Sequence, residues 1–190
     1  LDGKIFCVPV NIHSGQWMWL SHAAYENAGL DVPTDWNEFV ASAGKLEAAG
    51  TLPLAMGQQG WQQNLAFGAI TIAVAGTEAW REVTVNKNAE VANGPEYKAV
   101  FEAMVNAREL AAGSNVQDWN QATNMVITGT AGAQLMGDWA QGEFAVAGKV
   151  EGVDYSCLPG LGLNQILDTG GDAFYFPVND DPEIGRASCR

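Results

Sequence analysis

Four short stretches of the sequence set an aromatic side chain beside amide or carboxylate side chains. They read NIHSGQWMW, GQQGWQQN, GDWAQGEF and TGGDAF, and each is expected where a strand ends. A pyranose has apolar C–H faces and a rim of hydroxyl groups, so it is bound by flat aromatic faces together with carboxylate, amide or imidazole groups. Ligands of α/β proteins bind beyond strand ends. The pattern therefore favours a binding site for a neutral sugar.

Helices and short strands alternate along the chain that carries these stretches. Short apolar runs predict strands at residues 5–10 and 52–57, at the start of 132–144, and at 153–160 and 172–178. Apolar residues at helical spacing predict helices over residues 21–28, 34–50, 61–75 and 94–113, and a further helix that ends near residue 129. The alternation predicts an α/β fold rather than a helix bundle or a β-sandwich.

Capping residues mark the ends of two of these helices. Ser21 and Thr34 are expected to cap the N-termini, and Gly29 and Gly50 to supply the left-handed turns that end them. Trp36 lies on the apolar face of the second helix, so it is expected in the core. The inner face of the helix over residues 94–113 is expected to carry Tyr97, Val100, Phe101, Met104 and Leu110.

Charge and motifs exclude several classes of function. The net charge of −13 leaves no basic surface for a nucleic acid or an anionic membrane. The apolar runs are far shorter than the roughly 20 residues that span a bilayer. His13 and His22 do not stand in a cluster of metal-ligand spacing, so neither a metal nor a cofactor is expected. A carbohydrate-active hydrolase that pairs Asp138 or Glu143 with Asp172 remains an alternative.

The cysteines and the C-terminal residues give weaker signals. Cys7 and Cys157 are either small core residues or partners in one disulfide. Residues 183–190, EIGRASCR, resemble a translated sequencing adapter, and Cys189 falls within them. The first residues contain no initiator Met and no apolar leader, so an export signal is expected to be missing from this fragment.

Longer stretches occur in an order typical of one family. They include GKIFCVPVNIH, DWNQATNMVITGTAGAQLMGDWAQGEF, DYSCLPGLG and DAFYFPV. Over about residues 1–182 the chain resembles bacterial family 1 solute-binding proteins of sugar ABC transporters, and most of all the glucose/mannose-binding branch. The resemblance implies a periplasmic, non-enzymatic receptor that closes two lobes on a monosaccharide and delivers it to membrane permease subunits. A sensor of the same fold that docks to a signalling partner is the other reading.

The resemblance also implies an organisation of the chain. The implied fold is periplasmic binding protein-like, two-lobed and of type II. Residues 1–15 would form a hinge strand and crossing, 16–165 most of the C-terminal lobe, and 166–182 a return toward the N-terminal lobe.

The resemblance assigns site residues to the four stretches. It makes Trp139 the stacking aromatic, with Asp138 as its polar neighbour, and Asp172 the carboxylate that takes sugar hydroxyls. The family often has Asn-x-Asp at that last position, whereas this chain has Gly170. The other implied ligand residues are Asn11, His13, Trp61 and Gln62. If the Trp17 segment is extended, its two tryptophans share one face, and Trp17 is the one expected to reach the cleft edge.

Overall fold

The computed structural model describes residues 7–164 and 166–175 of the 190-residue chain. The chain divides into two compact units. Unit 1 comprises Leu1–His13 and Thr169–Arg190, and unit 2 comprises Ser14–Asp168. The sequence placed these boundaries near residues 15 and 165. The assignment of the two parts to the lobes of a larger protein stays a prediction.

Unit 2 is built on a four-stranded sheet in the order β4-β5-β3-β6. The strands are β3 (Trp17–Ser21), β4 (Leu52–Ala55), β5 (Ala131–Met136) and β6 (Tyr155–Pro159). β4 runs parallel to β5, whereas β3 runs antiparallel to both β5 and β6. Every residue of β5 is buried, as expected for a central strand that is covered on both faces.

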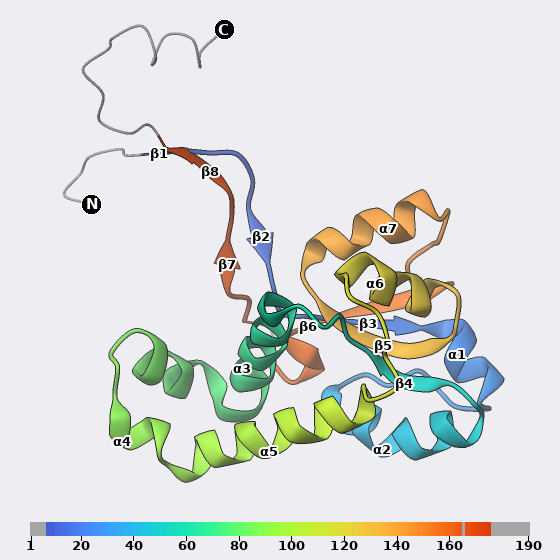
Figure 1. The fold of residues 1–190 in the computed structure, drawn as a ribbon, viewed down its shortest axis with the longest axis horizontal. Coiled ribbons are helices and arrows are strands. Elements are labelled where there is room, and N and C mark those ends of the chain that lie inside the picture. Colours follow the sequence, from blue (N-terminus) through green and yellow to red (C-terminus); the bar gives the residue numbers. More distant parts are fainter. Residues whose placement is uncertain (1–6, 165, 176–190) are drawn as a thin grey trace, which may run out of the picture. The chain divides into compact units, whose positions relative to one another are not determined.

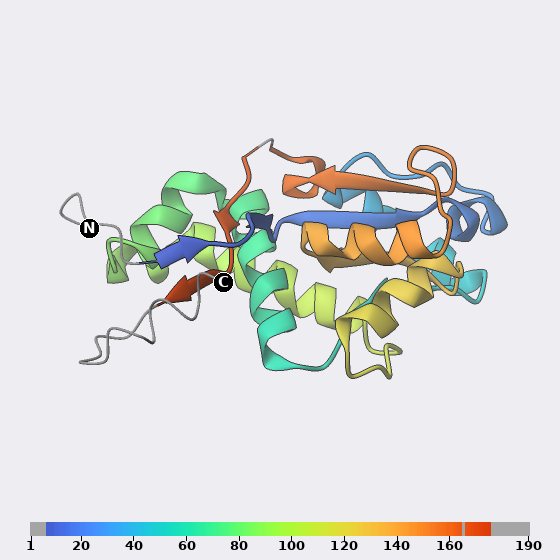
Figure 2. The same cartoon turned by 90° about the horizontal axis from the view of Figure 1, so that it is seen from above.

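Helices cover both faces of this sheet (Figures 1 and 2). The helices are α1 (His22–Asn27), α2 (Trp36–Ala48), α3 (Gly60–Thr84), α4 (Ala89–Ala92), α5 (Pro95–Leu110), α6 (Trp119–Ile127) and α7 (Gln141–Val146). Met18 and Leu20 pack into a cluster with α1, α2, α3 and α5, and Trp19 packs into a second cluster with α6 and α7. Successive side chains of β3 point to opposite faces of the sheet, so they contribute to two hydrophobic cores, one on each face.

Most of the predicted helix ends are confirmed. Ser21 caps α1 by accepting from the backbone N–H of Ala24, and Gly29 and Gly50 have φ of +66° and +80°. The prediction that Thr34 caps α2 is wrong. Asp35 is the cap, because its carboxylate accepts from two N–H groups of the first turn. The Thr34 hydroxyl and N–H instead both donate to the Glu38 carboxylate.

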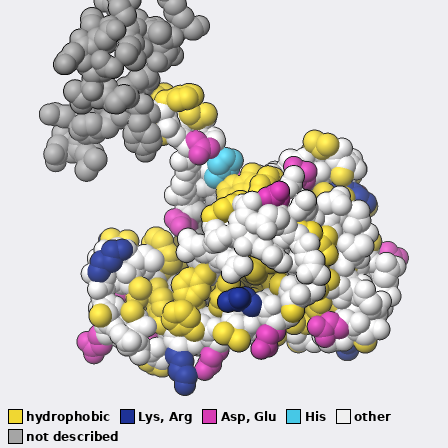
Figure 3. Space-filling view, viewed as in Figure 1, with side chains coloured by type: hydrophobic (Ala, Val, Ile, Leu, Met, Phe, Trp, Pro, Cys, Tyr) yellow, Lys and Arg dark blue, Asp and Glu magenta, His cyan; other side chains and the backbone are white. Residues whose placement is uncertain are grey.

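Two helices differ in part from the sequence expectation. The predicted helix end near residue 75 is confirmed by Gly76, where φ is +82° and the helical backbone is interrupted, but a second helical segment that was not predicted follows it within α3, to Thr84. Trp36 is buried as expected, but Phe101 is 56% exposed, and its ring centroid lies 5.3 Å from that of Phe67 with the ring planes inclined by 41°. Phe101 and Val105 are both exposed on α5, and Figure 3 shows apolar side chains gathered over α3 and α5. The helical spacing of apolar residues in α5 did not show that Phe101 lies on the exposed face of the helix.

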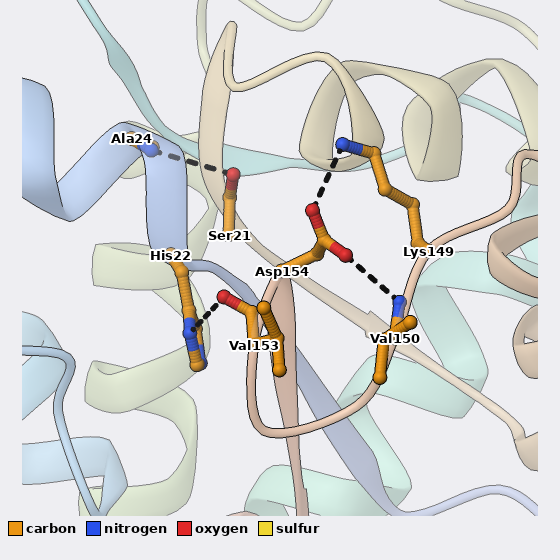
Figure 4. A network of polar contacts seen from close by, with 7 residues as sticks. All are labelled: Ser21, His22, Ala24, Lys149, Val150, Val153 and Asp154. Carbon is orange, nitrogen blue, oxygen red and sulfur yellow. Dashed lines mark hydrogen bonds and ion pairs between the residues drawn. The ribbon is translucent and has the colours of Figure 1, made fainter.

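A polar network pins the turn that leads into β6 (Figure 4). The Asp154 carboxylate accepts from the Val150 N–H at 2.9 Å and from the Lys149 ammonium at 3.3 Å. The two ring nitrogens of His22 lie 2.9 Å from the Val153 carbonyl and 2.7 Å from the Ser156 hydroxyl. His22 therefore ties the start of α1 to this turn.

Unit 1 is described over residues 7–13 and 169–175. Its strand β1 (Cys7–Pro9) pairs antiparallel with β8 (Ala173–Tyr175), and the short strands β2 (His13–Ser14) and β7 (Thr169–Gly170) pair with each other. A two-stranded ladder has only edge strands, which suits Pro9. The adapter-like residues 183–190 lie outside the described residues. Within the described ranges, no helix is both long and apolar enough to cross a membrane.

Candidate functional site

Two of the predicted aromatic residues meet in unit 2. Trp61 is the second residue of α3, and Trp139 lies in the short 3-10 helix Asp138–Ala140 that follows β5. Their ring centroids are 6.4 Å apart and their planes are inclined by 48°. Trp61 is 44% exposed and Trp139 is half-buried. The two elements thus bring together indole surface that can stack against a ligand.

Asp138 and Trp17 are linked through Ser14. The Ser14 N–H donates to Asp138 Oδ2 at 3.1 Å, and the Trp17 indole N–H donates to Ser14 Oγ at 3.1 Å. Trp17 is half-buried, whereas Trp19 is buried and stacks on Phe144 at 5.3 Å. The two closely spaced tryptophans therefore have different roles. Trp19 packs in the core, whereas Trp17 is partly exposed next to the Ser14–Asp138 contact.

The sequence reading missed a hydrogen-bonded chain beside Trp61. The Trp61 indole N–H donates to Gln59 Oε1 at 2.5 Å, and Gln59 Nε2 donates to Asp118 Oδ1 at 2.5 Å. Asp118 is also the N-cap of α6, where it forms a capping box with Gln121. The motif GQQGWQQN contains Gln59, but its position before a tryptophan did not show that Asp118 would lie next to it.

Gln62 does not present a surface to a ligand. Its side chain is 1% exposed, its amide donates to the Gln117 carbonyl at 3.2 Å, and its Oε1 packs over Gly57. Gln62 therefore acts as a buried support for the loop around Gln117. The exposed glutamine contact of this motif belongs to Gln59, which bonds to the Trp61 ring.

A groove of about 540 Å³ runs along α3 from Trp61. Its aromatic lining comes from Trp61, Phe67, Trp80 and Tyr97, and its polar lining includes Gln16 and Asp168. The Trp80 ring is half-buried and lines the groove, so it contributes to this surface.

Unit 1 brings together Asn11 and Asp172. Asn11 Nδ2 donates to Asp172 Oδ2 at 2.7 Å, and the Asp172 N–H donates to Asn11 Oδ1 at 2.7 Å. The Asp172 side chain is exposed, and His13 is half-buried two residues after Asn11. A Cβ atom at Gly171 would lie 2.2 Å from the Asn11 carbonyl oxygen, so the close approach of the two segments requires glycine there.

Histidine, acidic and cysteine side chains are the possible metal ligands and thiols of the described residues. Among the described residues, His, Cys, Asp and Glu side chains do not assemble into a group of three that could hold a metal. Cys7 and Cys157 are free thiols in the structure. Burial, together with a hydrogen bond from the thiol to Glu151, raises the pKa of Cys157 to about 12.

Comparison with known proteins gives a consistent family. Residues 1–180 match the family described as bacterial extracellular solute-binding protein. "Probable sugar-binding periplasmic protein" chains from Brucella suis and Rhizobium meliloti are 37% and 35% identical over 182 residues, or 95% of this chain. Those matches cover 43% and 44% of the relatives, so this chain spans less than half of their length.

Solved structures confirm the predicted fold class. A chitin oligosaccharide binding protein superposes with a TM-score of 0.73 at 20% identity, over 95% of this chain and 47% of that one. A manno-oligosaccharide specific solute binding protein from Bifidobacterium animalis has a TM-score of 0.67 at 16% identity, over 99% and 47%. Likeness at these identities shows the fold, which is α/β and of the type II periplasmic binding protein kind.

Proposed function

This chain belongs to the bacterial extracellular solute-binding protein family, and we propose that the complete protein is a sugar receptor of an ABC transporter. It would capture the sugar in the periplasm or at the cell surface and deliver it to permease subunits. The family consists of binding proteins and not of enzymes, which sets aside the hydrolase that would pair Asp138 or Glu143 with Asp172. The relatives named as sugar-binding periplasmic proteins support this location and this ligand class.

The observation that carries the proposal is the Trp61–Trp139 pair beside a held carboxylate. The tilted pair of indole rings offers apolar surface to the C–H face of a pyranose. The Ser14 N–H donates to Asp138 Oδ2 at 3.1 Å and so orients the carboxylate, which is the kind of acceptor that sugar hydroxyl groups bind. The arrangement is therefore organised before the ligand arrives, which limits the entropy lost on binding.

We assign hydroxyl contacts also to Asn11 and Asp172. One oxygen of Asp172 accepts from Asn11, so the pair is already oriented and still has unused acceptor positions. Hydrogen bonds to a carboxylate are stronger than those to a neutral acceptor, and a hydroxyl left without its partner costs about 1–3 kcal/mol. His13 and Trp17 complete the proposed set, and Gln62 leaves it because it is buried.

Within the sugars, we propose a monosaccharide of the glucose or mannose type, as the sequence resemblance implies. The structural neighbours include proteins with other ligands, among them a receptor with an exclusive preference for β-D-galactopyranose and a protein with bound D-mannitol. These names belong to those proteins. The choice among hexoses rests on the hydroxyl partners that each one would meet.

The test is a titration of the complete gene product with glucose, mannose, galactose, xylose and maltose, followed by tryptophan fluorescence. We expect saturable binding of one hexose, weakened about tenfold or more in Trp139→Ala and Asp172→Ala. Phe101→Ala and Asp31→Ala serve as controls, since they remove an exposed aromatic ring and an exposed carboxylate outside the site. The bound sugar should be recovered unchanged.

Two results would count against the proposal. Absence of binding to all five sugars would rule out the monosaccharide receptor, and a hydrolysed maltose would return the enzyme alternative. To separate transport from signalling, the sugar-loaded protein is added to vesicles that hold the permease subunits with ATP. Stimulated ATP hydrolysis would support a transporter, whereas its absence would favour the sensor reading.

A further inference from the structure

The ring of Trp139 lies against the backbone of Gly137, two residues earlier in the chain. A Cβ atom built on Gly137 would fall 2.2, 2.3 and 2.6 Å from three consecutive atoms of the six-membered ring, Cζ3, Cη2 and Cε3. Carbon atoms in contact are ordinarily 3.5–4.0 Å apart, at about the minimum of their dispersion energy. The space that any other residue would fill with its Cβ is therefore occupied by the indole.

The backbone of Gly137 does not itself require glycine. Its φ is −67° and its ψ is 171°, an extended conformation that every residue type adopts without strain. Gly137 is buried at the junction between β5 and the 3-10 helix Asp138–Ala140. The absence of a side chain at this position is thus explained by the ring that packs on it and not by the turn.

We propose that Gly137 is a positioning residue for the sugar site, because it sets where the Trp139 ring lies. Any side chain at residue 137 pushes the indole away by roughly 1 Å or more, since the ring cannot interpenetrate a Cβ atom. The displaced ring changes its relation to Trp61, which lies 6.4 Å away at an inclination of 48°. The stacking surface offered to a pyranose is then no longer the one that the native chain presents.

This inference rests on the proposed function where sugar affinity is measured. The spectroscopic measurements report on the surroundings of Trp139 and do not depend on that function. The main variant is Gly137→Ala in the complete gene product. The matched control is Gly142→Ala in α7, because no atom lies within 4 Å of a Cβ atom built there. Near-UV circular dichroism and acrylamide quenching of tryptophan fluorescence are recorded without sugar, and affinity is then measured with the sugar that the native protein binds.

We expect Gly137→Ala to retain the far-UV spectrum, to change the near-UV spectrum, and to weaken sugar binding about tenfold. Gly142→Ala should match the native protein in both measurements. In a Trp139→Ala background, the added Gly137→Ala change should alter affinity less than twofold, because the ring that the methyl group displaces is gone. In a Trp139→Phe background its effect should be intermediate, since phenyl lacks the outer part of the indole.

Several outcomes would overturn the inference. One is native affinity together with a native near-UV spectrum in Gly137→Ala. Another is an equal loss of affinity from Gly137→Ala with and without the Trp139 ring, which would show that the residue acts by a different route. If Gly137→Ala does not fold, the comparison moves to the Trp139→Phe pair, and a clash with the indole predicts that this double variant folds.

Failure of the proposed function is distinguishable from failure of this inference. A native protein that binds none of the five sugars refutes the former. The near-UV and quenching differences between Gly137→Ala and Gly142→Ala would still decide whether residue 137 positions the ring.

Discussion

Asn11 and Asp172 hold each other through two hydrogen bonds of 2.7 Å, although 161 positions separate them in the chain. The side-chain amide of Asn11 donates to the carboxylate of Asp172, and its carbonyl oxygen accepts from the Asp172 backbone N–H. This reciprocal contact joins the segment that follows β1 to the residue that precedes β8. It also fixes the direction in which the exposed carboxylate points before any ligand binds.

Removal of either partner of this pair should weaken sugar binding. We expect a loss of about tenfold or more for Asp172→Ala, which removes a charged acceptor, and a smaller loss for Asn11→Ala, which removes the group that orients it. The double variant should lose less than the product of the two, because the residues act as a unit. Isothermal titration with the preferred sugar measures all three. Fully multiplicative losses would mean that the two residues act independently.

Gln59→Ala should weaken binding by releasing the Trp61 ring. The indole N–H loses its acceptor, and the ring loses its connection to Asp118. We expect a loss of affinity of roughly three- to tenfold, smaller than that of Trp61→Ala. The neighbouring Gln58 makes a longer bond of 3.4 Å to the Ser114 carbonyl, so Gln58→Ala is the control. Equal effects of the two alanine variants would contradict a specific role for Gln59.

The stability of unit 2 should depend on pH through Asp154. The hydrogen bond from the Val150 N–H is the largest cause that holds the pKa of this carboxyl below its usual range, and the hydrogen bond from Lys149 adds to it. The ionised form therefore stabilises the folded state at pH values above the ordinary aspartate pKa of about 4, and this contribution is lost as the pH falls through the lowered pKa. Urea-unfolding midpoints of the native protein and Asp154→Asn should converge between about pH 5 and pH 2.

A control isolates that effect from general acid unfolding. Asp31 is an exposed aspartate, and Asp31→Asn should follow the native protein across the same pH range. A constant difference between the native protein and Asp154→Asn from neutral to acid pH would show that this carboxylate does not contribute through its charge.

The thiol of Cys157 should react slowly with alkylating agents. Burial and the nearby Glu151 carboxylate raise its pKa to about 12, so almost none of the nucleophilic thiolate is present at neutral pH. In a Cys7→Ser, Cys189→Ser variant we expect iodoacetamide at pH 8 to react at least about 100-fold faster after unfolding in urea. Glu151→Gln should raise the native rate.

The same reaction examines whether the cysteines pair. With all cysteines present, Cys7 and Cys157 should both be titratable as thiols after unfolding without a reductant, as the structure has them. Two missing thiols after the same treatment of a Cys189→Ser variant would establish a disulfide between them.

The local features of the fold were readable because they depend on neighbours in the chain. The cap at Ser21, the left-handed turns at Gly29 and Gly50, and the buried face of Trp36 all follow from the residues within one or two helical turns. The cap at Thr34 was misplaced by one residue because two adjacent oxygen-bearing side chains competed for it. Asp35 is the N-cap because its carboxylate accepts from two backbone N–H groups at once.

The contacts of the candidate site were not readable in the same way. Gln59 meets Asp118 across 59 positions, and Ser14 meets Asp138 across 124. Neither spacing has a periodic signature, so these pairs depend on how the sheet places β3, β4 and β5 beside one another. Gln62 illustrates the opposite error: the motif places it next to Trp61, but on a helix adjacent residues point in different directions, and Gln62 is directed into the core.

The ends of unit 2 are joined by a side chain. Gln16 Oε1 accepts from the Asp168 N–H at 2.5 Å, and the Gln16 carbonyl accepts from the Gly160 N–H at 2.8 Å. A continuous segment whose first and last residues are neighbours can be reconnected without distorting its interior. A short glycine-rich linker from residue 168 to residue 14 would thus close the segment into a ring, with new termini opened at the exposed turn around Lys87. The order of its strands in the sheet would be kept while their order along the chain was rewritten.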